Sequence, residues 1–170
     1  MRVEEFEQLY EEMAPPLFSF LVYRTGDRVL AEDLLSDTFE RALRARRRFN
    51  PLRGSTKNWL YAIALNCLRD HVRHESAGHR AQERTASLAP PPAQGDATAE
   101  HYAQVAERVQ VMDALHVLSP EEREAVALRF GAELTVPEMA KLLGEPLTTM
   151  EGRLYRALPK LRRVLEGEDG

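Results

Sequence analysis

The residues best suited to chemistry in this sequence are cations that stand apart from acids. Eight Arg and Lys residues lie between Arg41 and Arg69, and this segment contains no Asp or Glu. Because such a run produces a concentrated positive field, it is an electrostatic signature of a phosphate-bearing partner. The acids lie elsewhere in the chain, so the formal net charge of -4 averages over two different surfaces.

Cations, amides and aromatic rings are mixed at the centre of this segment, between residues 48 and 61. Proteins that hold unpaired bases use this mixture, since cations follow the backbone, rings stack on bases and amides read exposed base edges. The alternative is an ordinary loop whose Trp59 and Tyr61 are buried in a core. The absence of acids favours strand capture. The candidate residues are Arg48, Asn50, Arg53, Ser55, Lys57, Asn58, Trp59 and Tyr61.

A second set of cations lies near the C-terminus. Arg153, Arg156 and Lys160 follow one face of an expected helix, and apolar residues follow another face. A solvated helix with basic residues near its end would look the same. Here a short helix and a four-residue turn come first, which is the arrangement of a helix-turn-helix that reads duplex DNA. We expect base contacts from Thr148, Thr149, Glu151, Gly152 and Arg153, and phosphate contacts from Arg156 and Lys160.

Cys67, His71 and His74 share one helical face, at a spacing that could hold zinc. Only three ligands are visible, and Cys67 falls on the face expected to be buried, where cysteine behaves as a small hydrophobe. We therefore expect no metal and no cofactor. The single cysteine also excludes an internal disulfide. No nucleophile-base pair, phosphate-cradling glycine loop or carboxylate pair indicates an enzyme.

The elements that must position these residues are helical. Apolar residues recur at helical spacing and no alternating strand pattern is present, so we expect an all-α protein. Pro15 and Pro16 should separate the first two helices, and Asp27 should cap the third. In the first half of the chain, helices are expected near 3–13, 16–24, 28–48 and 55–74.

Three helices in the second half have clear starting signals. Potential capping boxes are formed by Ser119 with Glu122, Thr135 with Glu138, and Thr148 with Glu151. Helices should therefore begin at about 120, 136 and 149. Gly144 should end the second of them in a left-handed conformation, and Pro159 should kink or end the third.

The helical pattern stops between the two halves. Residues 76–104 are mostly small, polar or proline, which predicts a flexible linker. We therefore expect two small helical domains, over residues 1–75 and 105–170. No apolar run approaches the roughly 20 residues of a membrane-spanning helix, and the N-terminus is acidic, unlike a signal peptide. A cytoplasmic protein without membrane insertion is expected.

Two segments resemble conserved regions of bacterial sigma factors. Residues 31–73, AEDLLSDTFERALRARRRFNPLRGSTKNWLYAIALNCLRDHVR, look like region 2, and residues 118–163, which begin LSPEEREAVALRF, resemble region 4. The linker is too short for an intervening domain. This plan is similar to the extracytoplasmic-function (ECF) group of the sigma-70 family. The resemblance implies that the chain binds core RNA polymerase and directs promoter-specific initiation.

The resemblance also implies a role for each segment. The loop after Arg48 would capture a flipped base of the minus-ten element, with Asn50 lining the pocket. Region 4 would read the minus-thirty-five duplex and sit on the flap of the β subunit. Glu151 and Gly152 depart from the family pattern, which has a basic and a small hydroxyl residue there, and this leaves the base preference open. The helix near 28–48 would bind the clamp helices of the β′ subunit through Asp33, Leu34, Asp37, Thr38 and Arg41.

An anti-sigma factor is a further partner that the resemblance implies. Two other functions stay open on the sequence alone. The chain could be a stand-alone helix-turn-helix regulator that binds duplex operator without polymerase, or a sigma-like module that titrates a regulator. Transcription with purified core polymerase distinguishes the three.

Overall fold

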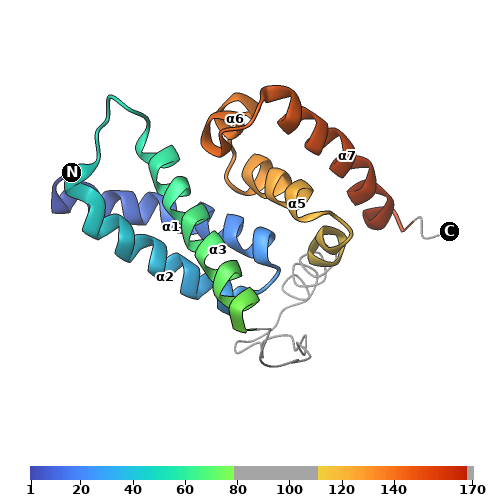
Figure 1. The fold of residues 1–170 in the computed structure, drawn as a ribbon, viewed down its shortest axis with the longest axis horizontal. Helices are drawn as coiled ribbons and strands as arrows, with labels where there is room; N and C mark the ends of the chain where they lie inside the picture. Colours follow the sequence, from blue (N-terminus) through green and yellow to red (C-terminus); the bar gives the residue numbers. More distant parts are fainter. Residues whose placement is uncertain (79–110, 168–170) are drawn as a thin grey trace, which may run out of the picture.

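The computed structural model describes residues 1–78 and 111–167, and every regular element in these ranges is a helix. The helices form two modules that lie side by side (Figure 1). The expectation of an all-α protein with two helical domains is confirmed. Within the described ranges, no helix is both long and apolar enough to cross a bilayer.

The first module contains three long helices. They are α1 (Val3–Thr25), α2 (Arg28–Ala45) and α3 (Thr56–Gly78), with the short 3-10 turn η1 (Arg46–Arg48) after α2. The predicted break at Pro15 and Pro16 is wrong, because α1 continues through both prolines. A proline inside a helix costs about 3 kcal/mol. Buried residues on both sides of the prolines, Leu9 and Leu17 among them, belong to one core, and their packing outweighs this cost.

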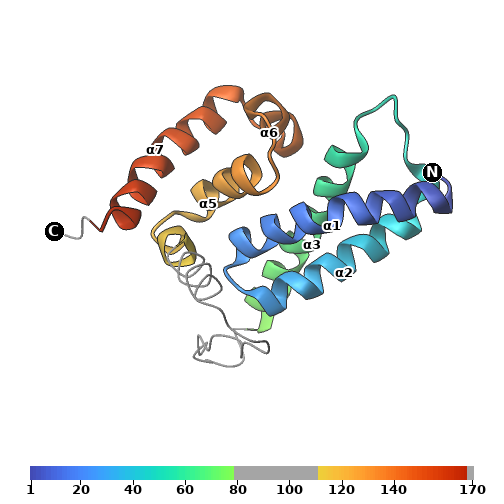
Figure 2. The same cartoon turned by 180° about the vertical axis from the view of Figure 1, so that it is seen from behind.

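A tight turn joins α1 to α2. Gly26 ends α1 in the left-handed region with a φ of 71°. Asp27 then caps α2 as predicted: its Oδ1 accepts hydrogen bonds from the backbone N–H groups of Val29 at 2.9 Å and Leu30 at 3.1 Å. The two helices can therefore reverse direction and pack against each other along their length (Figure 2).

The second module is built from shorter helices. After a helical turn at 111–116 come α5 (Pro120–Val126), the π-helical segment η2 (Ala127–Gly131), α6 (Val136–Leu143) and α7 (Leu147–Leu165). The capping boxes that start at Ser119 and Thr135 are confirmed, as is the left-handed end at Gly144.

The last helix differs from its prediction at both ends. It begins at Leu147, so the predicted capping box of Thr148 with Glu151 is wrong. The carbonyl of Pro146 starts the helix instead, by accepting from the N–H groups of Thr149 and Met150 at 3.0 and 3.3 Å. Pro159 lies inside α7 and does not end it.

The predicted linker at 76–104 begins too early. Residues 76–78 form the last turn of α3, and residues 79–104 lie outside the described residues. The predicted start of the second domain at 105 also lies outside them.

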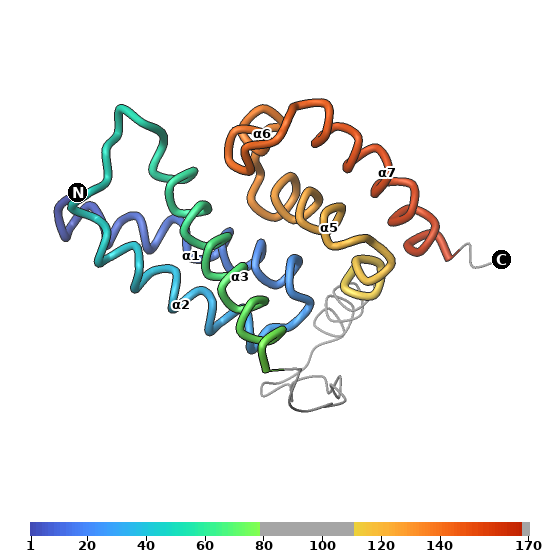
Figure 3. Tube along the Cα trace, in the orientation of Figure 1, coloured from blue at the N-terminus to red at the C-terminus, as the bar shows by residue number. Residues whose placement is uncertain are grey.

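The two modules touch through one side of each. Helix α1 contacts η2 and α5, and α3 contacts α6. The trace in Figure 3 shows α5 between α7 and the first module, with α7 on the outer side. The loop 49–55 projects from the far end of the first module (Figures 1 and 2). The loop 49–55 therefore lies away from the contact between modules, whereas Lys57 at the start of α3 lies near Glu138 of α6.

Candidate nucleic-acid interface

The loop between η1 and α3 has a defined shape. Asn50 Oδ1 accepts a hydrogen bond from the N–H of Leu52 at 3.0 Å, and the Asn50 carbonyl accepts from the N–H of Arg53 at 3.0 Å. This Asx turn folds the tip back on itself. The rings of Phe49 and Trp59 lie 5.1 Å apart and join the loop to α3. The cations Arg48 and Arg53, together with Asn50, are exposed on a preformed loop.

The next predicted residues start helix α3. Ser55 Oγ accepts from the N–H of Asn58 at 3.1 Å, so Ser55 caps the helix. Lys57 and Asn58 are half-buried in its first turn. The side-chain oxygen of Asn58 is buried and has no hydrogen-bond partner within the described part of the chain. The polar residues of this set therefore continue from the loop onto the start of α3.

The two aromatic candidates have different environments. Trp59 is half-buried at the base of the loop, whereas Tyr61 is completely buried. The Tyr61 ring packs edge-on against Phe20 of α1, with centroids 5.4 Å apart. Burial, and secondly the charge of Glu133, raise the pKa of Tyr61. In this arrangement Tyr61 is a core residue with no surface for a base.

The candidate polymerase-binding residues divide into exposed and buried ones. Leu34 and Thr38 face the core, and the Thr38 hydroxyl donates to the Leu34 carbonyl at 2.6 Å. Arg41 donates to Asp70 of α3 at 2.6 Å and to Asp37 at 3.2 Å, and these bonds raise its pKa. Arg41 thus clamps α2 to α3. Asp33 is exposed, while Asp37 and Arg41 are partly exposed and are paired with each other.

Helix α7 presents fewer free cations than its sequence suggests. The Arg153 guanidinium pairs with Glu145 at 3.3 Å, and its side chain is only 15% exposed. Lys160 pairs with Glu122 at 2.8 Å. Arg156 stays 61% exposed, at 3.9 Å from Glu122. Among the other predicted readers, Thr148 and Glu151 are exposed and Thr149 is half-buried.

Gly152 has a positioning effect on this surface. A Cβ atom added there would lie 3.2 Å from Nη1 of Arg156. The glycine therefore lets the Arg156 guanidinium lie close over the helix, on the exposed side of its first turns.

Comparison with known proteins decides which family these two modules represent. The model of sigma-70 region 2 matches residues 9–77, and the model of sigma-70 region 4 matches residues 108–161. The chain is 33% identical over 155 residues to the ECF RNA polymerase sigma factor SigC of Mycobacterium tuberculosis, a match that covers 90% of this chain and 79% of SigC. This chain belongs to the sigma-70 family, in its ECF group.

Two further matches describe how far the similarity extends. The chain is 30% identical to the ECF sigma factor BldN of Streptomyces coelicolor over 95% of its own length, but it spans only 61% of BldN. The solved structure of the sigma factor RpoE with the anti-sigma factor NepR, from Bartonella quintana, matches with a TM-score of 0.78 at 25% identity. That match covers 96% of this chain and 98% of RpoE, so it includes both modules. Sigma factors are not enzymes, and this confirms the expectation from the sequence that the chain has no catalytic site.

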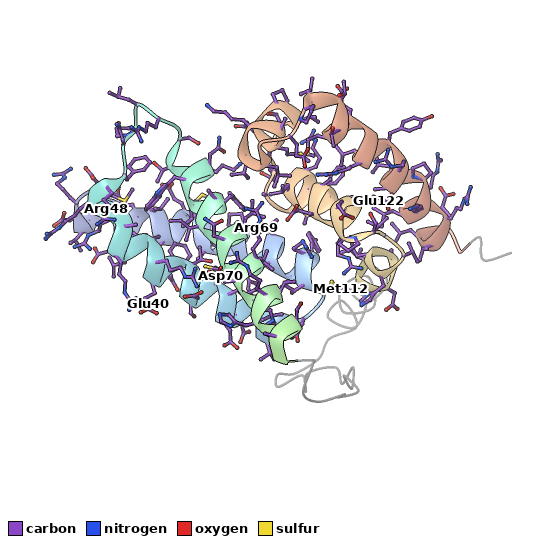
Figure 4. All side chains as sticks on the ribbon, in the orientation of Figure 1. Glu40, Arg48, Arg69, Asp70, Met112 and Glu122 are labelled. Carbon is purple, nitrogen blue, oxygen red and sulfur yellow. The ribbon has the colours of Figure 1, made fainter. Side chains whose placement is uncertain are left out.

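Helix α7 of region 4 is held by one buried carboxylate. Glu122 completes the capping box of α5, where it accepts from the Ser119 N–H at 3.1 Å. The same carboxylate accepts from Lys160 Nζ at 3.0 and 2.8 Å and lies 3.9 Å from Arg156 Nε. Figure 4 labels Glu122 on α5. These contacts lower the pKa of Glu122, the bond from Lys160 most of all. Lys160 is therefore an internal tie between α7 and α5.

Sequence reasoning missed two exposed residues of these surfaces. Tyr155 is 82% exposed on α7, and Leu52 is 93% exposed at the tip of the region 2 loop. Each could have been found from its position. Tyr155 falls outside the apolar stripe of its helix, and Leu52 sits in a short loop between Pro51 and Gly54, where no core can form.

The candidate zinc ligands lie in different environments. Cys67 is buried, and burial raises the pKa of its thiol. His71 Nε2 lies 3.3 Å from Glu75, and His74 is exposed. No group of three or more possible ligands gathers in residues 1–78 or 111–167.

The buried carboxylate predicts a pH-dependent stability of region 4. The pKa of Glu122 is lower in the folded than in the unfolded protein, so its stabilising effect is complete above the unfolded pKa of about 4.3 and is lost as pH falls through the lower folded value. Glu122→Gln should destabilise the protein to urea at pH 7, and the difference from wild type should shrink towards pH 3. Glu121→Gln, on the exposed side of the same turn, should change the stability at pH 7 by less than about 0.5 kcal/mol. A constant deficit of Glu122→Gln at every pH would contradict the assigned ion pairs.

Proposed function

We propose that this chain binds core RNA polymerase and directs initiation at promoters whose minus-ten strand it captures with region 2 and whose minus-thirty-five duplex it reads with region 4. One observation supports this most strongly. The loop 49–55 is shaped by its own hydrogen bonds, and the exposed cations Arg48, just before it, and Arg53, within it, have no carboxylate in the surrounding sequence. A stand-alone duplex-binding regulator would have no use for such a loop.

Strand capture would divide the work among the loop residues. Arg48 and Arg53 supply charge for the phosphates, and Trp59 with Phe49 offers an aromatic edge for an unstacked base. The Asn50 oxygen is used in the turn, whereas its amide N–H groups donate no hydrogen bond to the described residues and can donate to a base edge. Flipping a base from the duplex costs a few kcal/mol. A loop that is already folded loses less conformational entropy when it binds that base, so more of its binding energy can offset this cost.

Polymerase binding would use the outer face of α2. Asp33, Asp37 and Arg41 present charge there, while the buried Leu34 and Thr38 keep the helix in place. The family resemblance assigns this face to the β′ clamp helices and region 4 to the β flap. Because polymerase works on the chromosome, we place the protein in the cytoplasm.

Minus-thirty-five reading would use the first turns of α7. Thr148 and Glu151 lie where early residues of a recognition helix meet base edges, and Arg156 extends the surface towards phosphate. Tyr155 adds an exposed ring on the same helix. Arg153 supports the surface through Glu145. The acid at Glu151 would favour a cytosine amino group as its partner.

Transcription with purified core polymerase tests the proposal and its strand-capture step together. Wild type should initiate specifically on a duplex promoter, and Asn50→Ala should initiate poorly there but recover on a template whose minus-ten region is already melted.

Asn50→Ser, which keeps an acceptor for the turn, should separate loop shape from base reading. If Asn50→Ser behaves as Asn50→Ala, the amide reads a base; if it behaves as wild type, Asn50 serves only the turn. Asp33→Arg is the control, since weakened docking on polymerase cannot be rescued by melting.

The exposed cation of α7 gives a second prediction. Arg156→Ala should weaken binding of the holoenzyme to the minus-thirty-five duplex by about 1 to 3 kcal/mol if the side chain reads a base. Arg163→Ala, an exposed arginine near the far end of the same helix, is the matched control and should have a smaller effect. Equal weakening of Arg156→Ala on specific and scrambled sites would restrict its role to phosphate contact.

An anti-sigma factor is the regulatory partner that we propose. The similar RpoE chain was solved in complex with the anti-sigma factor NepR, and the similarity includes both modules. The tagged protein, purified from its native host, should therefore carry a stoichiometric partner other than polymerase under at least one growth condition. Recovery of only free protein and holoenzyme under every condition would contradict this proposal.

A further inference from the structure

A cavity of about 360 Å³ lies between the last turn of α1, the second half of α3, and α5. Sites for small molecules have volumes of roughly 300 to 1,000 Å³, so this cavity is large enough for a small ligand. The proposed contacts with promoter DNA and polymerase use none of its side chains. We call it the arginine cavity, and its lining includes Arg24, Leu68, Arg69, Val72, Arg73 and Glu124.

Helix α3 supplies one wall of the cavity. Arg69 and Arg73 are four residues apart, and side chains at this spacing lie on the same face of a helix. Leu68 and Val72 form the adjacent row at the same spacing. Figure 4 labels Arg69 on α3. This wall therefore offers two guanidinium groups beside a strip of apolar surface.

Helix α1 supplies a third guanidinium group, which is not fully satisfied. The Arg24 side chain is only 20% exposed, and its Nε is buried without a hydrogen-bond partner in the described ranges. Glu124 Oε1 lies 3.7 Å from this nitrogen, which is too far for a hydrogen bond. A buried donor without an acceptor costs free energy. An acceptor bound in the cavity would recover it.

Positive charge is in excess around the cavity. Glu124 is the one carboxylate in the lining and stands against three guanidinium groups, which leaves an excess of two positive charges. Arg69 is exposed and forms no ion pair with the described residues. Arg73 lies 3.6 Å from Asp70, but that carboxylate already accepts from Arg41 at 2.6 Å. The lining therefore favours an anion.

A further cation lies close to the same place. Burial, and secondly the charge of Arg24, lower the pKa of Arg123. The cations around the cavity are therefore close enough to repel one another, and a bound anion would reduce this repulsion.

The shape and chemistry of the lining favour a small phosphate ester. Guanidinium groups pair with phosphate through two parallel hydrogen bonds. A phosphate monoester carries a charge of about −1.5 to −2 at pH 7, which matches the excess of two positive charges. Leu68 and Val72 offer apolar surface to a ring. A duplex backbone is a poorer fit, because the Arg24 side chain is four-fifths buried and phosphates on a duplex surface would not reach it.

We propose that the arginine cavity binds a small phosphate monoester that carries a ring, of the class of the nucleoside monophosphates. The phosphate would lie between Arg24 and Arg69, and the ring would lie against Leu68 and Val72. The phosphate would compete with Glu124 for the guanidinium of Arg24. This site does not depend on the proposed promoter recognition.

Calorimetric titration of the full-length chain with AMP tests the site. One AMP should bind per chain, and it should bind more tightly than inorganic phosphate or adenosine, since each of these offers only part of the contacts. Arg69→Ala should weaken AMP binding about tenfold, because it removes a hydrogen bond between charged groups. Arg44→Ala removes the same charge from an exposed position on α2, outside the cavity, and is the matched control. It should change the affinity by less than about twofold.

The carboxylate of the lining gives a prediction of opposite sign. Glu124→Gln removes the group that competes with the phosphate, so it should tighten AMP binding about threefold. Circular dichroism should show that both Glu124→Gln and Arg69→Ala are folded. A gain in one variant and a loss in the other would support the site, because a general loss of structure would weaken binding in both. Weaker binding of AMP by folded Glu124→Gln would overturn it.

Three other results would overturn the proposal. One is the absence of AMP binding at about 1 mM ligand. Another is an equal loss of affinity in Arg69→Ala and Arg44→Ala, which would show diffuse attraction to a charged surface. The third is displacement of AMP by a random-sequence duplex that itself binds Arg69→Ala about tenfold more weakly, which would assign the cavity to the DNA backbone. Transcription with core polymerase tests the proposed function separately, so failure of one leaves the other standing.

Discussion

The arrangement of both modules depends on the burial of Phe20. Its ring packs against Tyr61 of α3, and its backbone lies against Gly131 of η2. One residue of α1 thus contacts the core of region 2 on one side and region 4 on the other. To bring Phe20 to this place, α1 must run straight on from its N-terminal half, which packs on α2. The two prolines are tolerated because the helix is held from both ends by buried side chains.

Short-range features of the fold could be predicted from the sequence because residues within four positions decide them. The caps at Asp27, Ser119 and Thr135 are of this kind, as is the end of α6 at Gly144. Features that depend on tertiary packing could not be predicted in the same way. Periodicity cannot show that α1 survives its prolines. The burial of Tyr61 likewise depends on a ring from another helix.

Carboxylates decide which cations of the candidate site remain available. Arg41 forms ion pairs with Asp70 and Asp37, Arg153 pairs with Glu145, and Lys160 pairs with Glu122. Sequence reasoning counts charges, but it cannot pair an arginine of α2 with an aspartate of α3. The exposure of the cations beside the loop was easier to predict. The sequence around Arg48 and Arg53 contains no acid that could pair with them. The pairing of the α7 cations was harder to predict, because their partners lie in the turn before α7 and in α5.

Three consecutive residues of α5 point in three directions, as a rotation of about 100° per residue requires. Glu122 faces α7, Arg123 donates to the carbonyls of Leu115 and Leu118, and Glu124 faces Arg24 of region 2. The contacts that hold α7 are therefore on a different side of α5 from those that hold the modules together. Separating the modules breaks the contacts of Glu124 and Gly131 and leaves the bond from Lys160 to Glu122 intact. The internal contacts of region 4 therefore do not depend on its contacts with region 2, and α7 stays attached to α5 through a carboxylate on another side of that helix.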